Sequence, residues 1–102
     1  GVAIADFMAT NPEPIWQRIV MNPPFSKRQD IHHVLHALKF LAPGGRLVAV
    51  MSKGAQFRQD RLATDFRRIL GQYNGTMIDL DDGAFKPSGT MVRTVAVTAQ
   101  RP

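Results

Sequence analysis

The residues best suited to chemistry are Asn22-Pro23-Pro24-Phe25, which combine an amide, a stiff backbone and an aromatic ring. An exocyclic amine such as adenine N6 is a poor nucleophile, because its lone pair is delocalised into the ring. The side-chain oxygen of Asn22 and the carbonyl oxygen of Pro23 can each accept one N–H, which favours a tetrahedral nitrogen. Phe25 can stack on the base, an interaction worth about 1–3 kcal/mol. The alternative is a tight Pro-Pro turn with Phe25 as core filler.

An apolar run leads directly into this motif. Ile19-Val20-Met21 is uncharged and partly β-branched, which predicts a buried strand over residues 18–22. Ligands of open α/β sheets bind at the carboxyl ends of strands, where the motif would lie. Each Pro fixes its own φ and restricts the residue before it, so the two acceptors would sit on an extended, stiff support.

The elements after the motif alternate between helix and strand. A helix with Asp30 in its first turn is predicted up to Pro43-Gly44-Gly45, and a strand over 46–52 is apolar enough to be covered on both faces. A second helix, ending at Asn74-Gly75, precedes strands at 76–81 and 92–99, which a turn-rich loop at 82–91 connects. The first helix is predicted from apolar residues at helical spacing: Ile31, Val34, Leu35, Leu38 and Leu41. Strand, helix and strand form a βαβ unit.

The motif and this order of elements resemble the class I S-adenosylmethionine-dependent methyltransferases, above all the DNA adenine-N6 enzymes with their NPPF motif. The resemblance covers essentially all 102 residues, but only the second half of the fold. It implies that residues 1–102 are a partial methyltransferase domain, from the third strand onward, in the α/β class. The sheet would be Rossmann-like and mixed, with an antiparallel final strand and the spatial order 18–22, 46–52, 92–99, 76–81.

The resemblance also implies where a cofactor would bind. In this family an Asp-Phe pair closes the third strand, where the acid accepts from the cofactor's adenine amino group and the aromatic ring packs on the adenine. Asp6 and Phe7 match that pair by position, although a turn Asp and a core Phe would look the same. The family's Gly-rich turn has no counterpart, because the chain contains no G-x-G. S-adenosylmethionine is thus the cofactor expected of the complete protein, and this chain alone is expected to be inactive.

Charge indicates a polyanionic partner. The net charge is +5 and the pI is near 10.5, which favours DNA or RNA as the substrate. Four basic residues flank the motif as candidate phosphate contacts, with solvation as an equal alternative: Lys27, Arg28, Lys53 and Lys86. A second group comprises Arg58, Arg61, Arg67 and Arg68, of which the last two are expected on a solvated helix face.

No metal or membrane segment is expected. The chain has no Cys, and no adjacent carboxylate completes a metal site with His32 and His36, which lie one helical turn apart. His33 is expected at the surface. Apolar runs are too short to cross a membrane and no signal peptide is visible, so a cytoplasmic protein is the simplest expectation.

Other functions remain open at this stage. The same chemistry serves guanine N2 in ribosomal RNA and the glutamine amide in protein methyltransferases, although Phe25 favours an aromatic nucleobase. A non-catalytic module for nucleic-acid binding or assembly is the alternative of a different class. Without the first two strands of the family's fold, strand 18–22 would be an uncovered apolar edge. Self-association is therefore expected.

Overall fold

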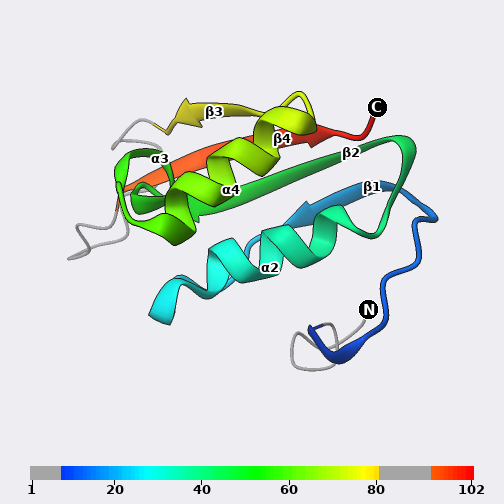
Figure 1. Cartoon of the computed structure of the whole chain (residues 1–102), viewed down its shortest axis with the longest axis horizontal. Helices are drawn as coiled ribbons and strands as arrows, with labels where there is room; N and C mark the ends of the chain where they lie inside the picture. Colours follow the sequence, from blue (N-terminus) through cyan, green and yellow to red (C-terminus); the bar gives the residue numbers. More distant parts are fainter. Residues whose placement is uncertain (1–7, 81–92) are drawn as a thin grey trace.

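The computed structural model describes residues 8–80 and 93–102, in which four strands form one mixed sheet (Figure 1). The strands are β1 (Trp16–Met21), β2 (Leu41–Ser52), β3 (Thr76–Asp79) and β4 (Thr94–Gln100). Their spatial order is β1-β2-β4-β3. β1 and β2 run parallel, and β4 is antiparallel to both β2 and β3. This confirms the order and the antiparallel final strand expected from the sequence.

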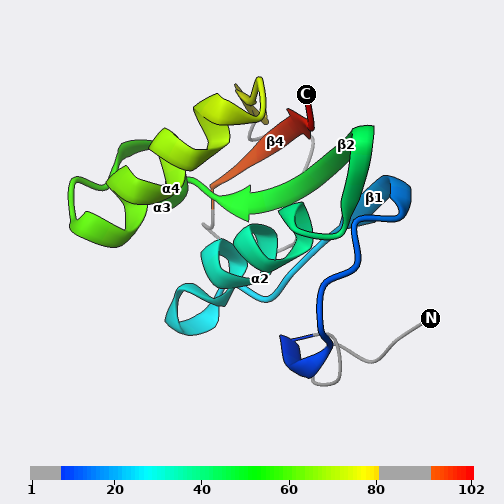
Figure 2. The same cartoon turned by 45° about the vertical axis from the view of Figure 1, so that its right-hand side comes forward.

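The helices gather on one face of the sheet. They are a short 3₁₀ turn η1 (Ser26–Arg28), α2 (Gln29–Leu38), the single-turn α3 (Gly54–Phe57) and α4 (Arg61–Gln72). Figures 1 and 2 show α2 and α4 side by side in front of the strands. None of the helices in the described ranges is long and apolar enough to cross a membrane.

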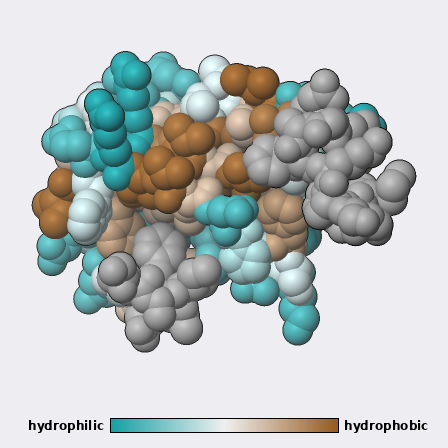
Figure 3. Space-filling view, turned by 180° about the vertical axis from the view of Figure 1, so that it is seen from behind, coloured by the Kyte–Doolittle hydropathy of each residue, from teal (hydrophilic) through white to brown (hydrophobic). Residues whose placement is uncertain are grey.

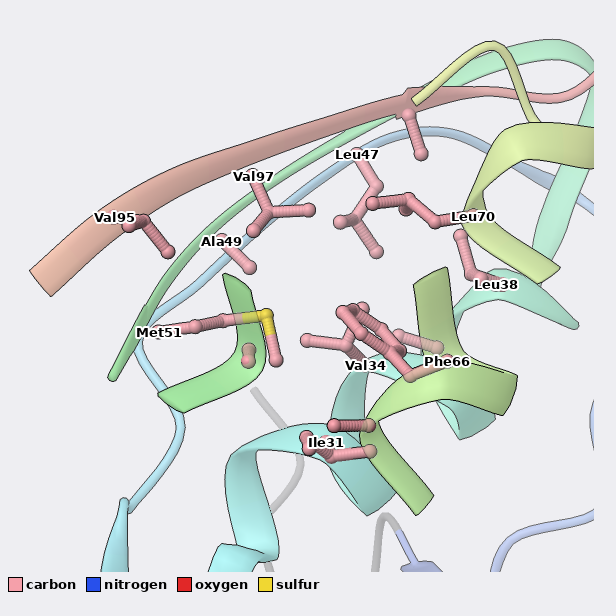
Figure 4. Packing of buried hydrophobic residues seen from close by; sticks show 14 of the residues in the cluster. Ile31, Val34, Leu38, Leu47, Ala49, Met51, Phe66, Leu70, Val95 and Val97 are labelled. Carbon is pink, nitrogen blue, oxygen red and sulfur yellow. The ribbon is translucent and has the colours of Figure 1, made fainter. Parts of the chain in front are cut away.

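The core lies between this helical layer and the inner face of the sheet (Figure 4). Alternate residues of β2 and β4 point inward, as period-two strands with one buried face require. Phe66 of α4 is fully buried at the centre of the helical layer. The buried cluster includes Ile31, Val34 and Leu38 of α2, Leu47, Ala49 and Met51 of β2, Leu70 of α4, and Val95 and Val97 of β4.

The end of the first helix differs from the prediction. α2 ends at Leu38, and Leu41 already begins β2, so Pro43-Gly44-Gly45 lies inside a strand. The register between β1 and β2 shifts here, because one residue lies between Trp16 and Arg18 whereas four lie between their partners Leu41 and Arg46. The glycines permit this irregularity. Gly44 has a φ of +80°, and a Cβ on Gly45 would lie 2.7 Å from the carbonyl oxygen of Trp16.

The outer face of the sheet is also unlike the prediction. Strand 46–52 was expected to be covered on both faces, but Arg46 and Val48 alternate outward and are exposed. Val20 on β1 is 83% exposed and Ile78 on β3 is 56% exposed. No helix among the described residues covers this side, and Figure 3 shows apolar surface on it. The apolar pattern of this strand therefore predicted more burial of the sheet than the described part of the chain provides.

Replacing Phe66 by Ala should lower the free energy of unfolding by about 3–5 kcal/mol, because it opens a cavity at the core's centre. Chemical denaturation followed by circular dichroism measures the change. Phe57→Ala is the matched control, since that ring is 59% exposed, and its effect should stay within about 0.5 kcal/mol. Equal effects of the two substitutions would contradict this description of the core.

Candidate functional site

The Asn22-Pro23-Pro24-Phe25 motif begins directly after β1. Because Met21 pairs with Ala49 in a parallel register, the carboxyl ends of β1 and β2 lie at the same edge of the sheet. Asn22 is exposed, Pro23 is buried and Phe25 is half-buried. The amide therefore reaches solvent from a backbone that Pro23 anchors in the protein.

The turn after the motif has an unusual backbone. The N–H of Arg28 donates to the carbonyl oxygen of Phe25 at 3.1 Å, which closes a four-residue turn. Lys27 and Arg28 have φ values of 54° and 61°, in the left-handed region that residues other than glycine rarely occupy. Such conformations cost about 1–3 kcal/mol each and persist only where the surroundings impose them. The turn is therefore held by other contacts.

The strongest of these contacts is a bidentate ion pair between Arg28 and Asp60. Nη1 of Arg28 lies 2.5 Å from Oδ2 of Asp60, and Nη2 lies 2.8 Å from Oδ1. Asp60 is also the N-cap of α4, where its Oδ1 accepts from the N–H of Ala63 at 3.1 Å. The hydrogen bonds from Arg28, followed by the one from Ala63, lower the pKa of Asp60 from 3.8 to about 2. Asp60 is therefore ionised at neutral pH.

A second carboxylate ties the start of α2 to the end of β2. Asp30 is 1% exposed, and its two oxygens accept from the N–H groups of Ile31 and Ser52, each at 3.0 Å. The sequence predicted only its place in the first turn of the helix. An acid just after the motif was the available signal, but its partner on β2 is 22 residues away. Only the fold brings the two together.

The candidate phosphate contacts differ in their surroundings. Lys27 is exposed beside the motif, whereas Nζ of Lys53 lies 3.3 Å from Oδ2 of Asp79 in an ion pair. Lys53 follows the end of β2 directly. Three other predicted site residues, Asp6, Phe7 and Lys86, lie outside the described residues.

The second arginine group is partly structural. Arg67 was expected on a solvated face, but its guanidinium donates to the carbonyl oxygens of Ala55 at 2.9 Å and Arg58 at 2.6 Å. That expectation is wrong because the segment before α4 folds back onto the helix. Arg68 is exposed, as expected, and lies 3.8 Å from Asp65.

The histidines of α2 do not share one environment. His33 is 5% exposed, so the prediction of a surface position is wrong; it lies on the face of α2 that packs inward. Burial, followed by the charges of His32 and His36, lowers the pKa of His33 below 6.5. Nε2 of His36 donates to the carbonyl oxygen of Thr10 at 3.1 Å. Across residues 8–80 and 93–102, no three His, Cys, Asp or Glu side chains form a candidate metal site.

Solved structures share this arrangement. No family model and no curated protein matches the chain. A chain from a structural study of complex assembly and conformational transition in the type I R-M system matches 84% of it, at 29% identity and a TM-score of 0.68. The M protein of the type I restriction enzyme EcoKI (EC 2.1.1.72) matches 87%, at 23% identity and a TM-score of 0.68. The described part of the chain has the mixed α/β fold of a class I S-adenosylmethionine-dependent methyltransferase fragment.

This chain spans only 21% of the length of each of these two matching chains. The motif follows β1, and β4 is the antiparallel final strand that the sequence predicted. The sheet order and the motif thus agree with each other.

The pKa of Asp60 predicts how stability depends on pH. The folded pKa of Asp60, about 2, lies below the reference value of 3.8. Between these two values the unfolded chain binds more protons than the folded chain, so the free energy of unfolding decreases as the pH is lowered. Asp60→Asn should therefore be less stable than the wild type at neutral pH, and the difference should shrink as pH falls through about 2. Denaturant unfolding of both proteins across this range measures it.

Asp65→Asn is the control for this titration. The contacts of Asp65 with Arg61 and Arg68 are both 3.8 Å long and lie at the surface, so they should contribute little at any pH. A difference between the wild type and Asp60→Asn that stays constant from neutral pH to below 2 would contradict the ion pair.

Proposed function

We propose that this chain carries the catalytic motif of a domain that transfers a methyl group from S-adenosylmethionine to an exocyclic amino group, adenine N6 in DNA. The observation that carries the proposal is the exposed amide of Asn22, at the shared carboxyl edge of β1 and β2 in a methyltransferase-family sheet. The EcoKI M protein is classified as EC 2.1.1.72, which supports the same reaction class.

The motif's own groups would activate the amine. The side-chain oxygen of Asn22 and the carbonyl oxygen of Pro23 accept its two N–H bonds, so the nitrogen lone pair is freed from the ring and directed away from them. Bound S-adenosylmethionine supplies an electrophilic methyl carbon. The amine held by Asn22 and Pro23 would accept this methyl group as the cofactor's sulfur leaves as a neutral thioether, and the nitrogen would release one proton to solvent. No strongly basic side chain is needed.

The base must leave the duplex to reach this site. Phe25 would hold the flipped base by stacking, and its half-buried position fixes the ring while leaving one part accessible. Lys27, Lys53 and Lys86 would contact phosphates. For Lys53 this requires that a phosphate replace its partner Asp79.

The cofactor would be shared with residues outside this chain. Asp6 and Phe7 would hold its adenine end, in keeping with their place in the family's pattern. The methionine and ribose portions need a Gly-rich turn, and the sequence contains no G-x-G. We therefore propose that residues 1–102 act as part of a longer methyltransferase and are inactive alone.

The catalytic role of the motif can be tested in the parent methyltransferase. Asn22→Ala should lower turnover about hundredfold or more, because one acceptor for the amine is lost. Phe25→Ala should lower it about tenfold through lost stacking. Methyl transfer to DNA, with mass spectrometry of the modified base, measures both. Lys39→Ala, an exposed change after the end of α2, is the control.

Three results would contradict parts of this proposal. Unchanged turnover in Asn22→Ala would exclude the acceptor mechanism. Methylguanine or methylglutamine as the product would exclude adenine. DNA binding by an intact parent that never transfers a methyl group would favour the non-catalytic module.

We also propose that copies of the isolated chain associate through β1. This strand forms one edge of the described sheet, and its outward residue Val20 is 83% exposed beside Val48, which is 41% exposed. An apolar edge strand offers both backbone hydrogen-bonding groups and apolar surface to a second copy.

Val20→Lys should shift the isolated chain toward the monomer, because a charge on an edge strand opposes strand pairing. Sedimentation velocity over a range of concentrations measures the change. Ile78→Lys is matched, since Ile78 is 56% exposed on β3, at the other edge of the sheet. A wild-type chain that stays monomeric at high concentration, or equal effects of the two changes, would contradict association through β1.

A further inference from the structure

The Arg28–Asp60 ion pair has no part in the chemistry proposed above, yet it reaches the motif from a distant element. The two residues are 32 positions apart in the chain. Arg28 is the last residue of the turn that follows Phe25, and Asp60 begins α4. The pair therefore connects the motif's loop to a helix that packs into the core.

Asp60 holds Arg28 in a fixed orientation. Its Oδ1 accepts from Arg28 and from the N–H of Ala63, and its Oδ2 accepts from Arg28 and from Nε of Arg58 at 3.2 Å. Four donors thus occupy the acceptor positions that a carboxylate offers. The planar fork of a guanidinium matches this carboxylate at two points, which restricts rotation as well as distance. Asp60 itself cannot turn without breaking the cap of α4.

The backbone passes this restraint from Arg28 to Phe25. The N–H of Arg28 donates to the carbonyl oxygen of Phe25, and the two residues enclose Lys27, whose φ of 54° would otherwise be unfavourable. A turn of this kind relaxes when its outer contacts are lost. Its relaxation would move Phe25, the first residue of the turn, before any other part of the motif.

The start of α2 does not need the pair. Asp30 already joins this end of the helix to β2, and Ile31 packs in the core. Loss of the ion pair should therefore disturb the turn between Phe25 and Arg28 more than the placement of the helix.

We propose that Arg28 and Asp60 are positioning residues for methyl transfer: their bidentate pair sets the Phe25–Arg28 turn, and so the place of the Phe25 ring against the target base. The inference rests on the proposed function of the motif. It adds a specific dependence of turnover on α4, an element that contributes no group to the reaction.

The test uses the parent methyltransferase with Arg28→Ala, Arg28→Lys and Asp60→Asn, singly, and with the first and last combined. Asn is as good an N-cap as Asp, so Asp60→Asn removes the charged pair while keeping the cap of α4. We expect kcat to fall about tenfold to hundredfold in Arg28→Ala and Asp60→Asn, the cost of a small misplacement at a reacting site. The KM for S-adenosylmethionine should stay within about twofold of the wild type, because substrate positioning and cofactor binding are separate interactions.

Two further comparisons isolate the pair. The kcat of the combined variant should be no lower than that of the worse single variant, because both changes remove the same interaction. Arg28→Lys should recover part of kcat, since it keeps the charge but not the fork. Arg61→Ala and Asp65→Asn are matched controls: they break an ion pair of 3.8 Å within α4, in which the Arg61 side chain is 94% exposed, and should leave kcat unchanged.

The outcomes separate this inference from the function it rests on. Full kcat in Arg28→Ala and Asp60→Asn, together with inactive Asn22→Ala, would overturn the positioning role alone. A parallel rise in the KM for S-adenosylmethionine, or additive losses in the combined variant, would show a general structural effect and overturn it as well. Active Asn22→Ala would overturn the proposed function, and the positioning role with it. Circular dichroism at the assay temperature confirms that each variant compared is folded.

Discussion

The pairing of β2 with two neighbours is the constraint on which the rest of the structure depends. β2 is the longest strand of the described sheet, and it runs parallel to β1 on one side and antiparallel to β4 on the other. Its inward residues Leu47, Ala49 and Met51 belong to the buried face of the sheet, against which α2 and α4 pack. Because β1 is fixed to β2, the motif's starting point follows from the same pairing. The position of the motif thus depends on a strand that contributes no residue to the motif.

Two carboxylates then determine the path of the chain after the motif. Asp30 is buried, and its oxygens accept from backbone N–H groups, one of them at the end of β2. Asp60 works at the surface through charge, with Arg28 as its partner. Buried hydrogen bonds and a charge-assisted surface pair thus hold the beginning of α2 and the turn before it. The loop that carries the exposed Asn22 is restrained by both.

The outer face of the sheet shows the limit of this chain as a unit. Helices cover one side, whereas Val20 and Val48 meet solvent on the other, in the described part of the molecule. A sheet with one solvated face usually alternates apolar and polar residues. The apolar residues on this exposed face depart from that pattern, and the chain spans only 21% of the length of each of the two matched solved chains.

The sequence by itself determined the order of elements and the motif's place after a strand, because hydrophobic period and Pro-Pro chemistry are local properties. It misjudged the end of α2, since Gly44 and Gly45 suit a helix stop as well as a bulge in β2, and only strand pairing distinguishes the two. It also missed the partners of Asp30 and Arg28, and it placed His33 at the surface. These depend on contacts between residues far apart in the chain, or on which face of a helix meets the sheet. Tertiary packing determines such contacts, because a local sequence pattern does not identify the distant donor that forms a hydrogen bond with a given carboxylate.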